Sequence, residues 1–258
     1  MAERLVTLTT DFGEGSSYVA AMKGALLSVN PAAHIVDLTH SIPPQDISAA
    51  ALFLADSLPH FPIGTIHVVV VDPGVGTNRA LLFVEWSKQR ILAPDNGCWT
   101  ALAFRGKPRV RQIVERRFFG QHGVSPTFHG RDILAPVAGH LSRGQDPAEL
   151  GQLVRDWVRL ELPRSRDTPK RKVGIVLWVD AFGNLITNIE VRSPVTIEGV
   201  QVGSASGIRV VHTFGDAKAG DLVALVGSSG RLEVAVVNGS AASYLGLGRG
   251  AEVVARLR

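Results

Sequence analysis

Residues 65–79 have the sequence TIHVVVVDPGVGTNR, and this stretch decides the fold. The segment from Thr65 to Val71 is apolar on both faces, which is typical of a strand at the centre of a sheet with helices on both sides. The proline and the glycines that follow impose a tight backbone path where this strand ends. We therefore expect a layered α/β arrangement built around residues 65–71.

Strand-like and helix-like segments alternate on the N-terminal side of this strand. Strands are predicted at 4–9 and 34–38, and helices at 16–29 and 45–58. The order strand, helix, strand, helix, strand is typical of parallel strands joined by right-handed crossovers. The first part of the chain is therefore predicted to be an α/β domain with a central, mainly parallel sheet.

The pattern changes after residue 162. Residues 163–172 combine two prolines with a run of Arg and Lys, which is more typical of an exposed linker than of a nucleic-acid-binding surface. Short β-branched segments separated by glycines follow at 173–179, 195–197, 208–211, 222–226, 232–237 and 251–254. They predict a smaller all-β domain, a barrel or a sandwich. We expect an α/β domain at 1–162, a linker at 163–172 and a barrel-like domain at 173–258.

Composition narrows the class of protein. The chain has 258 residues, of which 45% are hydrophobic and 19% charged, as in a folded globular protein. Its 27 basic and 23 acidic residues leave a net charge of +4, too small a surplus to predict a nucleic-acid partner despite a pI of about 9.6. The single cysteine, Cys98, excludes an intramolecular disulfide and a multi-cysteine metal centre. With no apolar run long enough to span a bilayer and no signal-peptide pattern at residues 1–5, we expect a cytoplasmic chain with no membrane partner.

Two candidate sites follow predicted strands. Asp11 stands where the first strand ends, the edge at which open α/β sheets bind ligands. Its carboxylate can accept hydrogen bonds from a ribose diol or can cap the following loop, and the residues leave both alternatives open. Asp72 ends the central strand, and the turn after it can bring Arg79 back as a charged partner, either for chemistry or to brace the turn. No Walker-type lysine follows these glycines, so a phosphate-binding P-loop is not expected.

A third candidate is the segment Thr-Phe-His-Gly-Arg-Asp at 127–132. His129 is the best candidate in the chain for a group that titrates near neutrality, although a lone histidine is more often structural. Gly130 lets the backbone approach a ligand closely, near the start of a predicted helix where negative charge is favoured. The neighbouring Gly-Arg-Asp raises the odds that His129 is functional.

Two further segments lie in the predicted β domain. At 179–189, Phe182 offers a stacking face and Asn184 offers hydrogen bonds to a purine edge; the alternative is a turn closed by Asp and Asn with a core Phe. The segment at 227–242 is either an ordinary hairpin or a site for an amino-acid head group or a base edge. No His-x-x-x-His or Asp-x-Asp pairing supports a metal site.

Together, these five segments resemble the S-adenosyl-L-methionine (SAM) hydroxide adenosyltransferases, relatives of the fluorinases and chlorinases. The resemblance runs from Leu8 to Ala242, and five motifs in the right order are more specific than any one of them. It implies an N-terminal α/β domain, a C-terminal barrel-like domain and a homotrimer with sites between subunits. The implied reaction is hydrolysis of SAM to adenosine and L-methionine. SAM is then the substrate, and no cofactor is required.

The resemblance also assigns roles to residues of this chain. Asp72, Arg79 and His129 match the water-activating triad of the family, and Asp11 matches the residue that holds the ribose hydroxyls. The remaining expected substrate-binding residues are Gly130, Phe182, Asn184, Ser228, Glu233 and Val236. The halogenases of the family carry Tyr in place of Asp72 and Tyr-Ser in place of His129 and Gly130, so this chain departs from them at the nucleophile pocket.

The chemistry favours the same branch. The sulfonium makes C5′ electrophilic, and what remains is to desolvate, align and activate a water; alignment can contribute about 7–11 kcal/mol and general-base help about 10²–10⁴-fold. A halide beside Asp72 would be repelled. Whether Asp72 or His129 is the formal base is left open by the residues. The alternatives are a halide-using adenosyltransferase on the same fold and a non-catalytic nucleoside- or RNA-binding protein.

Overall fold

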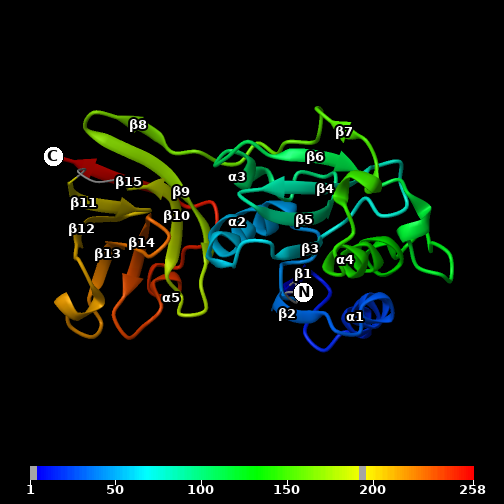
Figure 1. The fold of residues 1–258 in the computed structure, drawn as a ribbon. Coiled ribbons are helices and arrows are strands. Elements are labelled where there is room, and N and C mark those ends of the chain that lie inside the picture. Colours follow the sequence, from blue (N-terminus) through cyan, green and yellow to red (C-terminus); the bar gives the residue numbers. More distant parts are fainter. Residues whose placement is uncertain (1–4, 192–195) are drawn as a thin grey trace. The chain divides into compact units, whose positions relative to one another are not determined.

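The computed structural model describes residues 5–191 and 196–258, so the predicted starts of strands at Arg4 and Val195 lie outside the described residues. The chain divides into two compact units, Met1–Glu161 and Leu162–Arg258 (Figure 1). Part of the predicted linker at 163–172 is regular structure, because β8 (Arg166–Thr168) pairs with the first residues of β9 (Arg171–Val179). The predicted bounds of the two domains and the linker stay a prediction.

The first unit contains a seven-stranded sheet with the order β2-β1-β3-β5-β4-β6-β7. Its parallel part consists of β2 (His34–Thr39), β1 (Leu5–Thr10), β3 (Ile66–Val70) and β5 (Gln89–Pro94). Its antiparallel part adds β4 (Leu81–Trp86), β6 (Arg109–Gln112) and β7 (Leu153–Val154). As predicted, β3 is central and buried along its whole length.

The prediction of a mainly parallel sheet is wrong, because the sheet is mixed. The cause is a hairpin that the strand-helix alternation did not reveal: only Ser87 and Lys88 separate β4 from β5. Both residues have positive φ angles, 47° and 64°, as in a tight two-residue turn, and such a turn can join only antiparallel strands. This pair lacks the Asn-Gly or Asp-Gly signal by which a hairpin is usually predicted.

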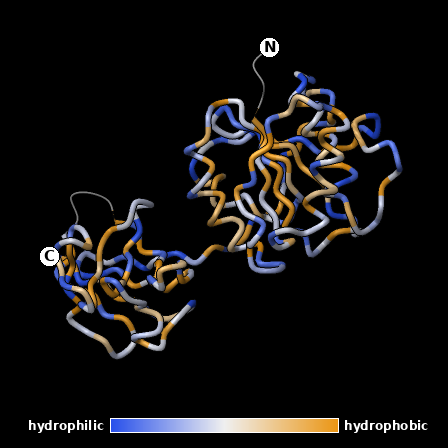
Figure 2. Tube along the Cα trace, turned by 90° about the horizontal axis from the view of Figure 1, so that it is seen from below, coloured by the Kyte–Doolittle hydropathy of each residue, from blue (hydrophilic) through white to orange (hydrophobic). Residues whose placement is uncertain are grey.

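Helices cover both faces of this sheet. On one face, α1 (Ser17–Val29) and α4 (Ala135–Ser142) contribute Met22 and Leu141 to one buried cluster. On the other face, α2 (Ile47–Ser57) and α3 (Thr100–Ala103) contribute Leu54 and Leu102 to a second cluster. In Figure 2 the apolar colour is concentrated in the interior of this unit. Short 3₁₀ turns lie at Leu58–His60, Arg116–Phe118 and Pro147–Leu150, and a π-helical turn at Gly130–Leu134 leads into α4.

The second unit is a β-barrel, which confirms the predicted architecture of the C-terminal domain. Its strands follow the order β10-β14-β13-β12-β11-β15-β9-β8, and an additional pairing of β10 with β9 closes seven of the described strands into a ring with β8 outside it. Besides β8 and β9, the strands are β10 (Leu185–Glu190), β11 (Ile197–Val202), β12 (Ala205–Val210), β13 (Leu222–Val226), β14 (Arg231–Val236) and β15 (Glu252–Leu257). A 3₁₀ turn at Phe214–Asp216 and the short α5 (Ala241–Leu245) complete it.

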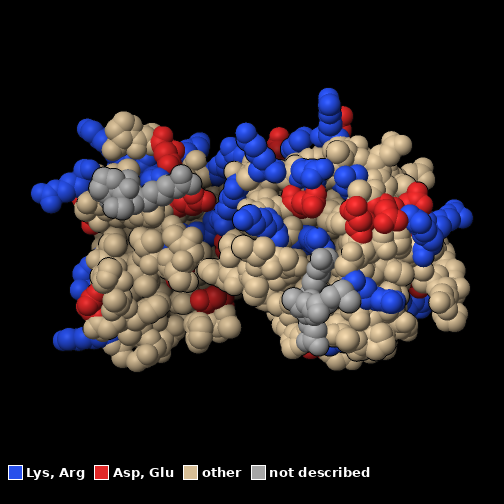
Figure 3. Space-filling model, in the orientation of Figure 1, with Lys and Arg blue, Asp and Glu red and all other residues tan. Residues whose placement is uncertain are grey.

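The surface charge, the helix lengths and the single cysteine relate to whether the protein has nucleic-acid, membrane or metal partners. On the face drawn in Figure 3, Lys and Arg side chains are interspersed with Asp and Glu. Within the described residues, no helix combines the length and apolar character needed to cross a membrane. Cys98 is buried, and burial raises the pKa of its thiol, so the neutral form is favoured.

Candidate active site

The site is built at the carboxyl edge of the parallel strands. Because β1, β3 and β5 run in the same direction, the residues that follow them meet at one edge of the sheet. Asp11 follows β1, and Asp72 follows β3 after one residue. The loop over residues 71–80 then leaves β3 and enters β4, so Arg79 returns to the same edge.

Asp72 and Arg79 form a buried ion pair. Arg79 Nε donates to Asp72 Oδ1 at 2.8 Å and to Oδ2 at 2.9 Å, and Arg79 Nη2 also donates to Oδ2. Only 6% of the Asp72 side chain and 9% of the Arg79 side chain are exposed, so each charge depends on the other for compensation. The structure shows the expected return of Arg79 to Asp72, while the choice between a role in chemistry and a role in bracing the turn stays open.

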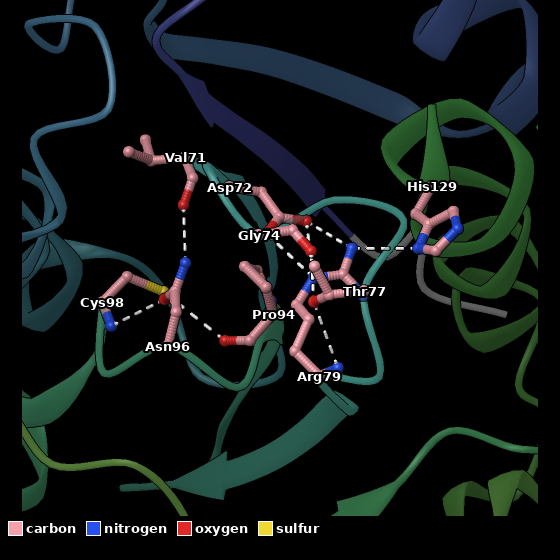
Figure 4. Close-up of polar contacts among 9 residues, drawn as sticks. All are labelled: Val71, Asp72, Gly74, Thr77, Arg79, Pro94, Asn96, Cys98 and His129. Atoms are coloured by element: carbon pink, nitrogen blue, oxygen red, sulfur yellow. Dashed lines mark hydrogen bonds and ion pairs between the residues drawn. The ribbon is translucent and has the colours of Figure 1, made fainter. Parts of the chain in front are cut away.

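Arg79 connects this pair to His129 (Figure 4). Arg79 Nη2 lies 2.9 Å from His129 Nδ1. A guanidinium can only donate, so Nδ1 must accept, and the neutral ring therefore carries its proton on Nε2. Burial first, and then the positive charge of Arg79, lower the pKa of His129 below its ordinary value of 6.5, which keeps the ring neutral at neutral pH.

A close backbone contact holds the loop near the segment that carries His129. Gly76 has a φ of +82°, and a Cβ placed there would lie 2.5 Å from the carbonyl oxygen of Pro126. A larger residue at this position would therefore push the loop away. The glycine permits the approach that puts Arg79 within reach of His129.

The backbone around His129 is supported by Asp132. Its carboxylate accepts the Ser125 N–H at 2.8 Å and pairs with Arg131 at 2.6 Å. Burial alone would raise the pKa of Asp132, but the hydrogen bonds from Arg131 and Ser125 lower it overall. Gly130 is buried, and a Cβ there would lie 3.1 Å from Val70 and 3.3 Å from Met22. Its small size therefore serves helix-on-sheet packing, and its expected contact with a ligand stays a prediction.

Asp11 makes one side-chain hydrogen bond among the residues that the structure describes. Its Oδ2 accepts the backbone N–H of Gln45 at 2.8 Å, which ties the loop after β1 to the loop after β2. The alternative left open by the sequence was a cap on the loop that directly follows Asp11, whereas the observed bond goes to a different loop. A carboxylate has about four lone-pair directions, so this bond leaves capacity for a ribose hydroxyl, and that role stays a prediction.

Two of the expected site residues of the barrel lie in a turn held by Asp180. Asp180 accepts the Asn184 side chain at 2.9 Å and the Phe182 backbone N–H at 2.9 Å, so the turn is closed by Asp and Asn as one alternative held. Phe182 is 79% exposed, so it is not a core residue and its ring is open to a ligand. Burial, and then the charge of Asp180, raise the pKa of Glu233. Val236 is buried in the barrel core, and Ser228 lies in the turn between β13 and β14.

Comparisons with known proteins address the identity of the chain. The model of the SAM hydroxide adenosyltransferase N-terminal domain matches residues 6–151, and that of the C-terminal domain matches residues 174–254. The chain belongs to the SAM hydroxide adenosyltransferase family. The family inferred from the five sequence segments is therefore confirmed.

Individual relatives of the chain support the same family. A Thermus thermophilus protein named (R)-S-adenosyl-L-methionine hydrolase is 40% identical over 97% of this chain and 98% of its own length. A Salinispora tropica protein of the same name is 38% identical over 94% of both chains. A fluorinase from an Actinoplanes species is 26% identical over 90% of both.

Solved structures of similar proteins share the whole fold. An uncharacterised conserved protein from Thermotoga maritima matches with a TM-score of 0.89 at 34% identity, covering 97% of this chain and 99% of that one. A conserved hypothetical protein from Thermus thermophilus matches with a TM-score of 0.78 at 38% identity, covering 99% and 100%. Within the described residues of this family member, no group of three or more His, Cys, Asp or Glu side chains is placed to hold a metal ion.

Proposed function

We propose that this chain hydrolyses SAM to adenosine and L-methionine. The observation that carries the proposal is the hydrogen-bonded set of Asp72, Arg79 and His129 in a chain of this family. The relatives named (R)-S-adenosyl-L-methionine hydrolase are 34–40% identical to it, whereas the fluorinases are 25–27% identical. Their name also specifies the sulfonium epimer on which the enzyme is to be tested.

The reaction is a substitution at C5′. The oxygen of a water attacks C5′ while the C5′–S bond breaks, and the electron pair of that bond stays on sulfur. Methionine leaves as a neutral thioether, the water oxygen becomes the 5′-hydroxyl of adenosine, and one proton is released. No electron transfer occurs, so this step requires only that water be aligned and its proton accepted.

The tautomer of His129 bears on which group accepts that proton. Because Nδ1 accepts from Arg79, the other ring nitrogen carries a proton and is able to donate it. Asp72 keeps lone pairs beyond those taken by Arg79, and its negative charge favours proton acceptance. We assign Asp72 the role of orienting the water and accepting its proton, His129 the role of a neutral donor, and Arg79 the role of holding both.

Isotope transfer tests the reaction. With (R)-SAM in ¹⁸O-water, adenosine should carry the label in its 5′-hydroxyl, while methionine should carry none. Absence of turnover, or unlabelled adenosine, would overturn the proposal. Added chloride or fluoride should not yield 5′-halo-adenosine faster than adenosine, because a halide next to Asp72 would be repelled. If the halogenated product forms faster, the halide-using alternative is correct.

The proposal also covers the substrate-binding residues, the domain bounds, the oligomeric state and the location of the protein. We assign substrate binding to Asp11, Gly130, Phe182, Asn184, Ser228, Glu233 and Val236. We also propose domains at 1–162 and 173–258, a homotrimer, a cytoplasmic location, and catalysis without a cofactor or a nucleic-acid partner. Sedimentation tests the trimer, and turnover after dialysis against a chelator tests the independence from metal ions.

A further inference from the structure

The two ends of the loop over residues 71–80 are held by the residues that follow β5. In the sheet, β5 lies between β3 and β4, so the loop passes over the carboxyl end of β5 on its way from one neighbour to the other. The backbone N–H of Asp95 donates to the carbonyl oxygen of Ala80 at 2.9 Å, directly after Arg79. The side chain of Asn96 reaches the other end of the loop.

Both polar atoms of the Asn96 amide are engaged. Its Nδ2 donates to the carbonyl oxygen of Val71 at 2.8 Å, and its Oδ1 accepts the backbone N–H of Cys98 at 3.1 Å. Figure 4 shows the amide between these two partners. The bond from Cys98 fixes the orientation of the amide, and the bond to Val71 then fixes the peptide unit that leads into Asp72.

We propose that Asn96 is a positioning residue for the reaction, acting on Asp72 through the Val71 carbonyl; this inference rests on the proposed function. The loop shapes itself locally, since Thr77 Oγ1 donates to the Gly74 carbonyl at 2.7 Å, but that bond does not attach the loop to the sheet. The Asn96 side chain ties the Asp72 end of the loop to the residues that follow β5. A catalytic group misplaced by about 1 Å can cost about 10²-fold in rate.

Two substitutions separate the parts of this role. Asn96→Ala removes both hydrogen bonds, whereas Asn96→Asp keeps the acceptor for Cys98 but places a carboxylate oxygen against the Val71 carbonyl. Both should lower kcat by about 10–100-fold and leave KM within about threefold, because Asn96 acts on the reacting groups rather than on substrate binding. If kcat stays within threefold of the parent in both variants, the inference is wrong.

Asn30 provides a matched control in the same unit. It caps the end of α1 remote from the site, its Nδ2 donates to Ser142 Oγ at 2.8 Å, and its Oδ1 accepts the Ala32 N–H at 3.2 Å. Asn30→Ala therefore loses an equivalent pair of bonds and should destabilise the unit by a similar amount without lowering kcat. An equal loss of kcat in Asn30→Ala and Asn96→Ala would show a general effect of stability and would contradict the inference.

A spectroscopic measurement decides the point without turnover. The ¹⁵N shifts of the His129 ring, assigned by their absence in His129→Gln, should show Nδ1 unprotonated and Nε2 protonated in the parent. In Asn96→Ala the displaced loop should weaken the Arg79 bond and shift the ring toward a mixture of tautomers, whereas Asn30→Ala should match the parent. An unchanged tautomer in Asn96→Ala overturns the inference, and failure of the parent to form adenosine overturns the proposed function instead.

Discussion

In the first unit the carboxylate of Asp72 is paired with the guanidinium of Arg79, whereas in the barrel the carboxylate of Glu233 lies close enough to Asp180 for their charges to repel. In the first arrangement the two charges compensate each other without a ligand, while Arg79 Nη1 is buried and has no hydrogen-bond partner within the described residues. In the second arrangement the negative charges of Glu233 and Asp180 repel each other. A positively charged group of a ligand would stabilise it. The contrast fits the proposed roles, in which Asp72 and Arg79 serve the chemistry and Glu233 serves substrate binding.

The largest expected effect is on turnover. Asp72→Ala should lower kcat by about 10²–10⁴-fold with little change in KM, because it removes the group that we propose orients and deprotonates the water. Arg79→Ala and His129→Ala should also lower kcat. Adenosine formation is measured by chromatography, with Glu85→Gln, which removes a surface partner of Arg109, as the control. If all three variants bind and turn over SAM like the parent, the active site lies elsewhere.

The next effect concerns stability. Arg79→Ala leaves the Asp72 charge buried without a partner and should lower the free energy of unfolding by about 3–5 kcal/mol. Arg209→Ala removes an ion pair of similar type in the barrel, but that pair is exposed, with Arg209 3.5 Å from Asp221, and it should cost under about 1 kcal/mol. Urea unfolding measures both free energies. Equal losses in the two variants would contradict the difference between a buried and an exposed ion pair.

The two units should also respond oppositely to acid. Burial lowers the pKa of His67 in β3 to about 4, whereas the unfolded chain titrates near 6.5, so between these values the unfolded state binds more protons. Stability of the first unit should therefore fall by about 3 kcal/mol from neutral pH to pH 4. The raised pKa of Glu233 has the opposite sign: its contribution is present at acid pH and is lost as pH rises through that pKa.

Hydrogen exchange resolved by segment tests this difference. Protection in β3 should fall between pH 6.5 and 4, after correction for the intrinsic rate, while protection in β14 should not. His67→Phe should reduce the pH dependence of the first unit, while His129 and Asp132, whose pKa values are also lowered, keep the remainder. Parallel losses of protection in the two units would show that neither group is responsible.

A smaller effect is expected in the pH profile of kcat. Protonated His129 can no longer accept from Arg79, so kcat should fall about tenfold per pH unit below the pKa of His129. Because burial and Arg79 lower this pKa, the midpoint of the acid limb should lie below 6.5. A midpoint above 6.5 would show that the ring is stabilised in its charged form during catalysis.

The smallest expected effect is on binding by the barrel. Glu233→Gln removes one half-buried negative charge and should raise KM for SAM by about two- to fivefold, the scale of a partly exposed ion pair, with kcat unchanged. Glu252→Gln on the exposed side of β15 serves as the control and should change neither constant. A fall in kcat with unchanged KM would place Glu233 in the chemistry rather than in binding.

Much of the fold followed from local pattern. The helices predicted at 16–29 and 45–58 are α1, which begins after its cap at Ser16, and α2, which begins after its cap at Asp46. The glycine-punctuated β segments predicted the barrel. The sequence did not predict the mixed sheet, because the turn at Ser87 and Lys88 needs positive φ angles, which serine and lysine do not signal as Asn-Gly or Asp-Gly would.

For the active site as well, some features followed from the sequence and others only from the tertiary structure. The sequence by itself determined the family and the three residues that the structure brings together, because motifs in order carry both residue type and position along the chain. Tertiary structure alone decided the direction of the strands beyond β3, the tautomer of His129 and the part played by Asn96. These depend on which groups lie within hydrogen-bond distance across the sheet, and Asn96 is 25 residues from its partner Val71 along the chain, a separation that no local pattern spans.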